Sequence, residues 1–160
     1  MGWKPVTRAA TTSGSAEGTT PLNAFDNALL AAGIGNINLV KVSSILPPET
    51  AVVDLPRLRP GAIVPTAYAA MTSEVPGEVV AAAVGWARPT DTKANGVIME
   101  FHGAGTRADA EEKIQQMLEE AFQVRGEVIR EMRVFAVDHT VERVGCAVAA
   151  ITLLSEEDLA

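Results

Sequence analysis

The sequence predicts an α+β protein of one domain, a layered αββα sandwich with mainly antiparallel sheets. Two helical patterns are separated by several apolar segments that are typical of strands, and strand and helix do not alternate regularly along the chain. Regular alternation is typical of parallel sheets, so its absence favours antiparallel pairing. A chain of 160 residues is long enough for one hydrophobic core, and we therefore assign residues 1–160 to a single domain.

The first part of the chain predicts an extended segment followed by a helix. Residues 1–20 are rich in Gly, Ser, Thr and Ala, and we expect them to form an extended or irregular lead-in. Thr20 is suited to cap the helix, Pro21 to its first position and Gly33 to its end.

One face of this helix combines apolar and acidic residues. Leu22, Asp26 and Leu29 share it, because they are spaced by four and three residues. An exposed position is the simplest interpretation of Asp26. A carboxylate between two leucines nevertheless makes this face a candidate for binding.

The centre of the chain predicts four strands separated by turns. These strands are expected at residues 37–46, 62–72, 78–87 and 96–101. Pro47-Pro48 ends the first strand, and Val75-Pro76-Gly77 forms the turn between the second and the third. The alanine-rich segments could be helical, but the flanking turns and the pairs of valines favour strands.

The last third of the chain contains the clearest helix. Thr106 begins it, Asp109 stands where the acid of a capping box belongs, and Gly126 ends it. The remaining segments are expected to be two strands, 128–138 and 144–154, and a frayed acidic tail, 155–160.

Composition excludes several functions. A net charge of −7 and a pI near 4.8 argue against binding to nucleic acid or to anionic membranes, and are compatible with a cationic ligand. Cys146 is the only cysteine, which rules out an internal disulfide and fits a reducing cytoplasm. We expect no secretory signal, no spanning helix and, with only His102 and His139 as imidazole ligands, no metal site.

The most informative motif is the serine pair Ser43-Ser44, which follows an apolar segment and precedes Ile45-Leu46-Pro47-Pro48. A serine at a strained junction can attack the carbonyl group of the residue before it. Elimination from the resulting ester gives dehydroalanine and then a pyruvoyl group. Such a group condenses with an amine and accepts electrons during decarboxylation. By itself, however, a serine pair usually marks only the end of a strand.

Further segments make the chain resemble the pyruvoyl-dependent arginine decarboxylases over residues 14–154. The segments that carry this resemblance are residues 14–18, 20–26, 33–39, 42–48, 64–68, 75–78, 98–100, 139–142 and 145–147. The group that ends at Pro48 is the most specific of them.

The resemblance implies that the chain cleaves itself between Ser43 and Ser44. Residues 1–43 would form the β chain and residues 44–160 the α chain, with Ser44 converted to a covalent pyruvoyl cofactor. Asn38 matches a residue that polarises the carbonyl group of Ser43. Glu100 matches the proton donor that acts after carbon dioxide has left.

The resemblance also implies the substrate and the assembly. Asp26 matches a carboxylate that pairs with the guanidinium group of the substrate, and Leu22, Leu29 and Ile45 match residues that line its pocket. The expected reaction converts L-arginine to agmatine and carbon dioxide, a step suited to polyamine biosynthesis. The expected assembly is a homotrimer with active sites between protomers.

Three alternatives remain open at this stage. The substrate could be another basic amino acid, such as histidine or lysine, because a single carboxylate does not choose among cations. The chain could be a homologue without catalytic activity. Ser44 could also act as the nucleophile of a hydrolase, which would need a base within hydrogen-bond reach.

Overall fold

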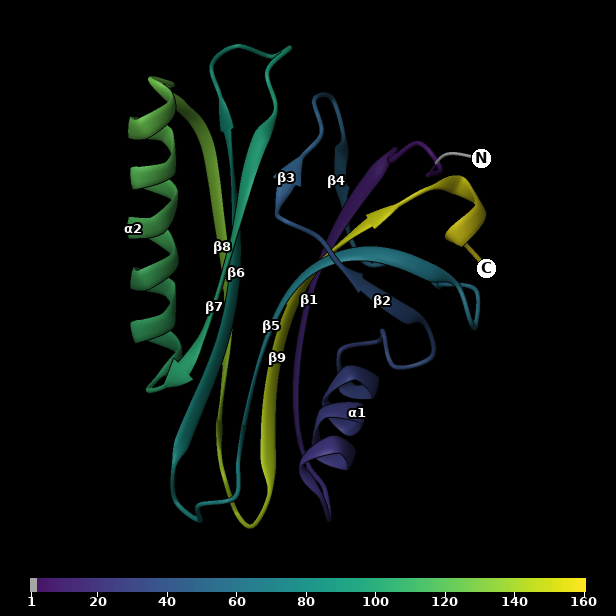
Figure 1. The fold of residues 1–160 in the computed structure, drawn as a ribbon, viewed down its shortest axis with the longest axis vertical. Coiled ribbons are helices and arrows are strands. Elements are labelled where there is room, and N and C mark those ends of the chain that lie inside the picture. The colour runs from purple at the N-terminus through teal and green to yellow at the C-terminus, as the bar shows by residue number, and fades with distance from the viewer. Residues whose placement is uncertain (1–2) are drawn as a thin grey trace.

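The computed structural model describes residues 3–160 as two β-sheets packed face to face, with one helix on the outer face of each sheet (Figure 1). This arrangement confirms the αββα sandwich. The helix α1 (Pro21–Ala31) covers the larger sheet and α2 (Arg107–Arg125) covers the smaller one. The two helices therefore lie on opposite sides of the molecule.

The larger sheet has five strands in the order β2-β5-β9-β1-β4. Their bounds are β1 Arg8–Glu17, β2 Asn38–Lys41, β4 Ala51–Val53, β5 Ile63–Ser73 and β9 Gly145–Leu154. Strand β9 pairs antiparallel with both β1 and β5. The two outer strands, β2 and β4, pair in parallel with their neighbours, so the sheet is mainly but not wholly antiparallel.

The smaller sheet has four strands, all antiparallel, in the order β3-β7-β6-β8. Their bounds are β3 Ile45–Leu46, β6 Val79–Pro89, β7 Gly96–Ala104 and β8 Ile129–Thr140. Within residues 3–160, strand β3 pairs only with the first residues of β7, and no other strand lies along the rest of that edge of β7.

The helix ends follow the sequence closely. The Thr20 side chain accepts a hydrogen bond from the Asn23 amide at the start of α1. Thr106 and Asp109 form both bonds of a capping box at the start of α2, and Gly126 ends α2 with φ of 69°. These predictions are confirmed.

Small side chains in the central strands allow the layers to approach closely. On one face of β6 the buried residues pack between the two sheets, and on the other face they pack against α2. This strand is therefore covered on both faces. A Cβ atom on Gly85 would lie 2.4 Å from the Ile114 side chain. The richness in alanine that suggested a helix is therefore a consequence of double burial in a strand.

The lead-in predicted to be extended or irregular forms a strand inside the larger sheet, β1. Residues of β1 pair with β9 along its whole length, and α1 packs directly against β1. A Cβ atom on Gly14 would lie 2.6 Å from the Ala32 nitrogen and 2.7 Å from the Ala28 oxygen. The small residues of this segment thus serve close packing rather than flexibility.

Two further expectations were wrong. The strand predicted over residues 37–46 is broken into β2 and β3, because the backbone turns at Ser44. The tail predicted to fray contains a 3₁₀ helix (Glu156–Asp158) in which Asp158 is buried, and Leu159 forms an isolated bridge with Leu58. Among residues 3–160, no helix is long and apolar enough to cross a bilayer.

Candidate active site

Ser44 lies at the break between β2 and β3 in a backbone conformation that is rare for serine. Its φ is 81°, and the only other non-glycine residue with positive φ in the described chain is Glu49. A conformation of this kind costs about 1–3 kcal/mol and persists only where neighbouring contacts enforce it. Here the Ser44 oxygen accepts a hydrogen bond of 2.9 Å from the Ile98 amide, and Ile45 pairs with Val97.

The Ser44 side chain is directed at a carboxylate. Its hydroxyl oxygen lies 2.7 Å from one oxygen of Glu100 and 2.9 Å from the other, so the hydroxyl donates to that carboxylate. Glu100 comes from β7, 56 residues along the chain, and Ser44 itself is only 7% exposed. A buried hydroxyl nucleophile and a half-buried carboxylate that could act as its base therefore lie in direct contact.

A small pocket opens beside this pair. It has a volume of about 250 Å³ and is lined by Ser43, Ser44, Ile45 and Glu100, together with residues of β7 and α2. Sequence reasoning missed the contributions of α2, which are Met117 and Arg125. Nothing in the sequence linked either residue to the serine pair.

The predicted substrate-binding residues lie on both sides of the sandwich. Ile45 lines the Ser44 pocket, whereas Leu22, Asp26 and Leu29 belong to α1 on the other outer face. Leu29 is buried against the larger sheet, Asp26 is exposed, and Leu22 is 75% exposed. Within one chain, Asp26 is therefore not brought to Ser44.

Asn38 begins β2 and has a structural contact of its own. Its side-chain amide donates a hydrogen bond of 3.3 Å to the Gly61 oxygen, and its backbone amide donates to the Ala62 oxygen. These bonds hold β2 against the start of β5. The polarising role at the Ser43 carbonyl stays a prediction.

Glu17 fixes the segment that leads into α1. One carboxylate oxygen accepts from the backbone amides of Glu142, Arg143 and Val144 at 3.2, 2.7 and 3.2 Å, and the other lies 2.5 Å from the His139 ring. Partial burial opposes ionisation, but bonds from His139 and the turn prevail and hold the pKa of Glu17 below its ordinary value. His139 thus helps to order the turn between β8 and β9 through its contact with Glu17.

The fold and the site together define a class of protein. A solved structure of a pyruvoyl-dependent histidine decarboxylase at pH 8 shares the fold with a TM-score of 0.54, at 16% identity. The match covers 62% of this chain and 54% of that one, so the chain spans about half the length of this structural neighbour. At this identity the match shows that the two proteins share an αββα fold.

Sequence comparison makes the assignment specific. The family model of the pyruvoyl-dependent arginine decarboxylases matches residues 8–158, and the chain belongs to this family. The curated arginine decarboxylase of Methanocaldococcus jannaschii is 50% identical over 141 residues, covering 88% of this chain and 86% of its own. The curated arginine decarboxylase of Pyrococcus abyssi is 42% identical over 156 residues, with 96% and 98% covered.

Family membership confirms three predictions from the sequence. The family resemblance was correct, the cofactor is a covalently bound pyruvoyl group, and the protein is an enzyme of the decarboxylase class that acts on an amino acid. Family membership by itself does not assign roles in the reaction to individual residues.

Proposed function

We propose that this chain cleaves itself between Ser43 and Ser44 and then decarboxylates L-arginine to agmatine and carbon dioxide. The observation that carries the proposal is the hydrogen bond from the strained, buried Ser44 to Glu100. Self-cleavage requires a strained peptide and an acceptor for the hydroxyl proton. The positive φ of Ser44 meets the first requirement, and the Glu100 carboxylate meets the second.

Glu100 acts first in cleavage. It takes the proton from the Ser44 hydroxyl, whose oxygen attacks the carbonyl carbon of Ser43. The peptide nitrogen of Ser44 leaves that carbon and gains a proton, which gives an ester. Elimination then releases residues 1–43 with a Ser43 carboxylate, and water displaces ammonia from the new end of residues 44–160.

The contacts around Ser44 would hold the pyruvoyl group that cleavage creates at this position. The pairing of Ile45 with Val97 and the bond from Ile98 to Ser44 lie on the downstream side of the scissile bond. They can hold position 44 after cleavage. When formed, the pyruvoyl group supplies a ketone that binds the substrate amine and accepts the electrons left by carbon dioxide. Glu100 lies within reach to hold a proton and return it to the substrate carbon.

Asp26 gives the preference for a guanidinium group. A carboxylate can accept two parallel hydrogen bonds from guanidinium, which favours arginine over a compact ammonium. Because α1 covers the outer face of the larger sheet, whereas the Ser44 pocket is lined by residues of β7 and α2, Asp26 would serve the Ser44 of another protomer. The exposed Leu22 would then cover the aliphatic part of that substrate, together with Ile45 of the protomer that holds Ser44.

A homotrimer is the assembly that we propose for this shared site. A closed ring lets every protomer offer α1 to one neighbour and receive α1 from the other. We place the enzyme in the cytoplasm, because its one cysteine, Cys146, is a buried free thiol that makes no use of an oxidising compartment.

Two alternatives are less well supported. Histidine or lysine would offer Asp26 a cation without the paired donors of guanidinium, and the named relatives act on arginine. An inactive homologue would have no need to keep Ser44 strained and bonded to Glu100.

The proposal is tested by following cleavage and carbon dioxide release in three variants. Ser44→Ala should remain one chain and release no carbon dioxide. Glu100→Gln should slow cleavage by about 100-fold or more, since loss of a general base typically costs this much. Glu120→Gln is the matched control and should behave as wild type, because Glu120 is on the exposed face of α2 and its side chain bonds to none of residues 3–160. Normal cleavage and turnover in Glu100→Gln would overturn the proposed role of Glu100.

A further inference from the structure

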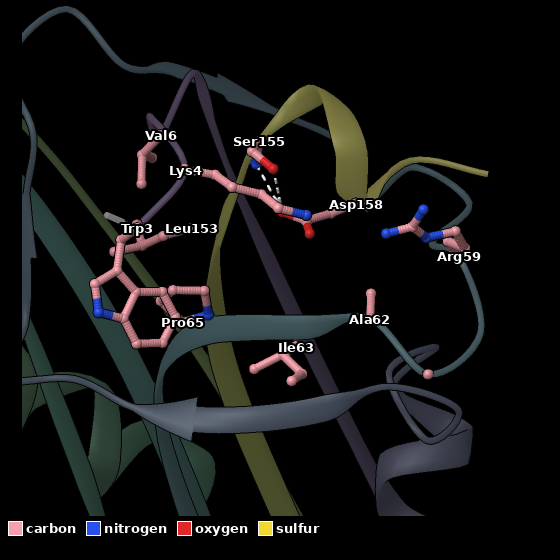
Figure 2. A pocket seen from close by; sticks show the side chains of 11 residues that line it. Trp3, Lys4, Val6, Arg59, Ala62, Ile63, Pro65, Leu153, Ser155 and Asp158 are labelled. Atoms are coloured by element: carbon pink, nitrogen blue, oxygen red, sulfur yellow. Dashed lines mark hydrogen bonds between the residues drawn. The ribbon is translucent and has the colours of Figure 1, made fainter. Parts of the chain in front are cut away.

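A second pocket lies at the end of the larger sheet, where both ends of the described chain meet the start of β5 (Figure 2). Its volume is about 500 Å³, which is in the range of sites for small molecules. None of its lining residues lines the Ser44 pocket, so it is a separate place on the molecule.

The pocket has apolar walls because the two sheets do not overlap fully. Ala67 and Ala69 of β5 face the space between the sheets, and the alternation of a strand places Ile63 and Pro65 on the same face. The smaller sheet does not reach that far, and Ile63 is 61% exposed. Leu153 of β9 extends the wall, and the Trp3 ring stands on the Pro65 side of the hollow (Figure 2).

One guanidinium at this pocket is available to bind an anion. Arg59, Lys4 and Asp158 line the pocket, and Glu157 beside Lys4 offsets the charge of that lysine. Lys4 pairs with Glu157 at 2.7 Å, and Asp158 accepts from the Ser155 amide and hydroxyl at 2.8 Å. In the described part of the chain, no carboxylate lies within ion-pair distance of the Arg59 guanidinium, which leaves its donors available.

We propose that this pocket binds a small aromatic carboxylate. A planar ring would lie against Trp3 and the apolar wall of Ile63 and Pro65, since aromatic rings stack on indole. The carboxylate would take paired hydrogen bonds from Arg59, an arrangement suited to guanidinium. This site does not depend on the decarboxylase assignment.

A small molecule fits the pocket better than a protein surface does. A stable protein interface buries about 800 Å² on each partner. Of the large apolar side chains that are exposed in the described chain, only Trp3 and Ile63 line this pocket. Two such side chains around a concave hollow are few for a docking face and are typical of the mouth of a ligand site.

The fluorescence of Trp3 provides a direct test with the purified, full-length protein. The chain has two tryptophans, and Trp86 is only 4% exposed. The difference in fluorescence between wild type and Trp3→Phe therefore reports Trp3 alone, at the pocket. Phenylacetate should change this signal saturably, with a dissociation constant of about 1 mM or below, as expected for a ligand of its size. Acetate, which lacks the ring, and 2-phenylethylamine, which lacks the carboxylate, should bind at least about tenfold more weakly.

Arginine variants distinguish the site from a general affinity for anions. Arg59→Ala should weaken phenylacetate binding about tenfold or more, since it removes a charge-assisted pair. Arg57→Ala is the matched control, because Arg57 is also exposed and does not line the pocket. Equal binding of the amine, no saturation by 10 mM phenylacetate, or no effect of Arg59→Ala would overturn the proposal. A Trp3 signal that follows protein concentration and oligomer size would overturn it in favour of a second copy.

Discussion

Replacing Glu17 by Gln tests how strongly a single carboxylate fixes the entry into α1. The carboxylate accepts three backbone amides from the turn between β8 and β9 and contacts His139. Gln keeps an acceptor oxygen but loses the charge that strengthens all four contacts. The Glu17 side chain is 26% exposed, so solvent weakens these contacts. We expect a loss of about 1–2 kcal/mol in the free energy of unfolding, or roughly 3–6 °C in the melting temperature.

This loss should depend on pH with a defined sign. The pKa of Glu17 is lower in the folded chain than its ordinary value of 4.5, so ionised Glu17 stabilises the fold above that value. The stabilisation disappears as the pH falls through the folded pKa, because the proton that binds there removes the charge. Wild type and Glu17→Gln should therefore differ at pH 7 and converge towards pH 3.

Thermal unfolding followed by circular dichroism between pH 3 and pH 7 measures this difference. Glu142→Gln is the control, since Glu142 lies in the same turn but its side chain is exposed and bonds to no residue in the part of the chain that the structure describes. It should leave the melting temperature within about 1 °C of wild type. A Glu17→Gln loss of equal size at pH 3 and pH 7 would refute the reasoning, as would a loss no greater than that of Glu142→Gln.

Two further predictions concern packing and substrate binding. Gly14→Ala should destabilise the fold by about 1–3 kcal/mol in urea unfolding, because its Cβ atom would lie 2.6 Å from the Ala32 nitrogen. An unchanged urea midpoint would show that α1 does not pack closely against β1 at this position. Asp26→Asn should raise KM for arginine about tenfold or more with little change in kcat, whereas Asp91→Asn, an exposed control, should change neither. An unchanged KM for Asp26→Asn would remove that carboxylate from the substrate site.

The sequence predicted the elements whose signals are local. The capping box of Thr106 and Asp109 and the left-handed Gly126 mark the ends of α2 by chemistry that acts within a few residues. Strand β1 was missed because its small residues are typical of loops when they are read alone. Their purpose becomes clear only against α1, whose backbone leaves Gly14 no room for a side chain.

The candidate site was predictable to the extent that the family motif specifies it. The motif paired Ser44 with Glu100, and the structure brings their side chains into contact although 56 residues separate them. The break at Ser44 was not predicted, because the apolar residues Ile45-Leu46 follow the serine pair and no glycine marks a turn there. The distance between α1 and Ser44 depends on the layers of the fold, which no local pattern encodes.

Intact-mass spectrometry of the purified, catalytically active protein tests the central claim most directly. We expect two chains, residues 1–43 and residues 44–160, the second lighter by one ammonia than simple hydrolysis of the peptide bond would leave it. Active protein that contains only the unbroken chain of 160 residues would contradict the account.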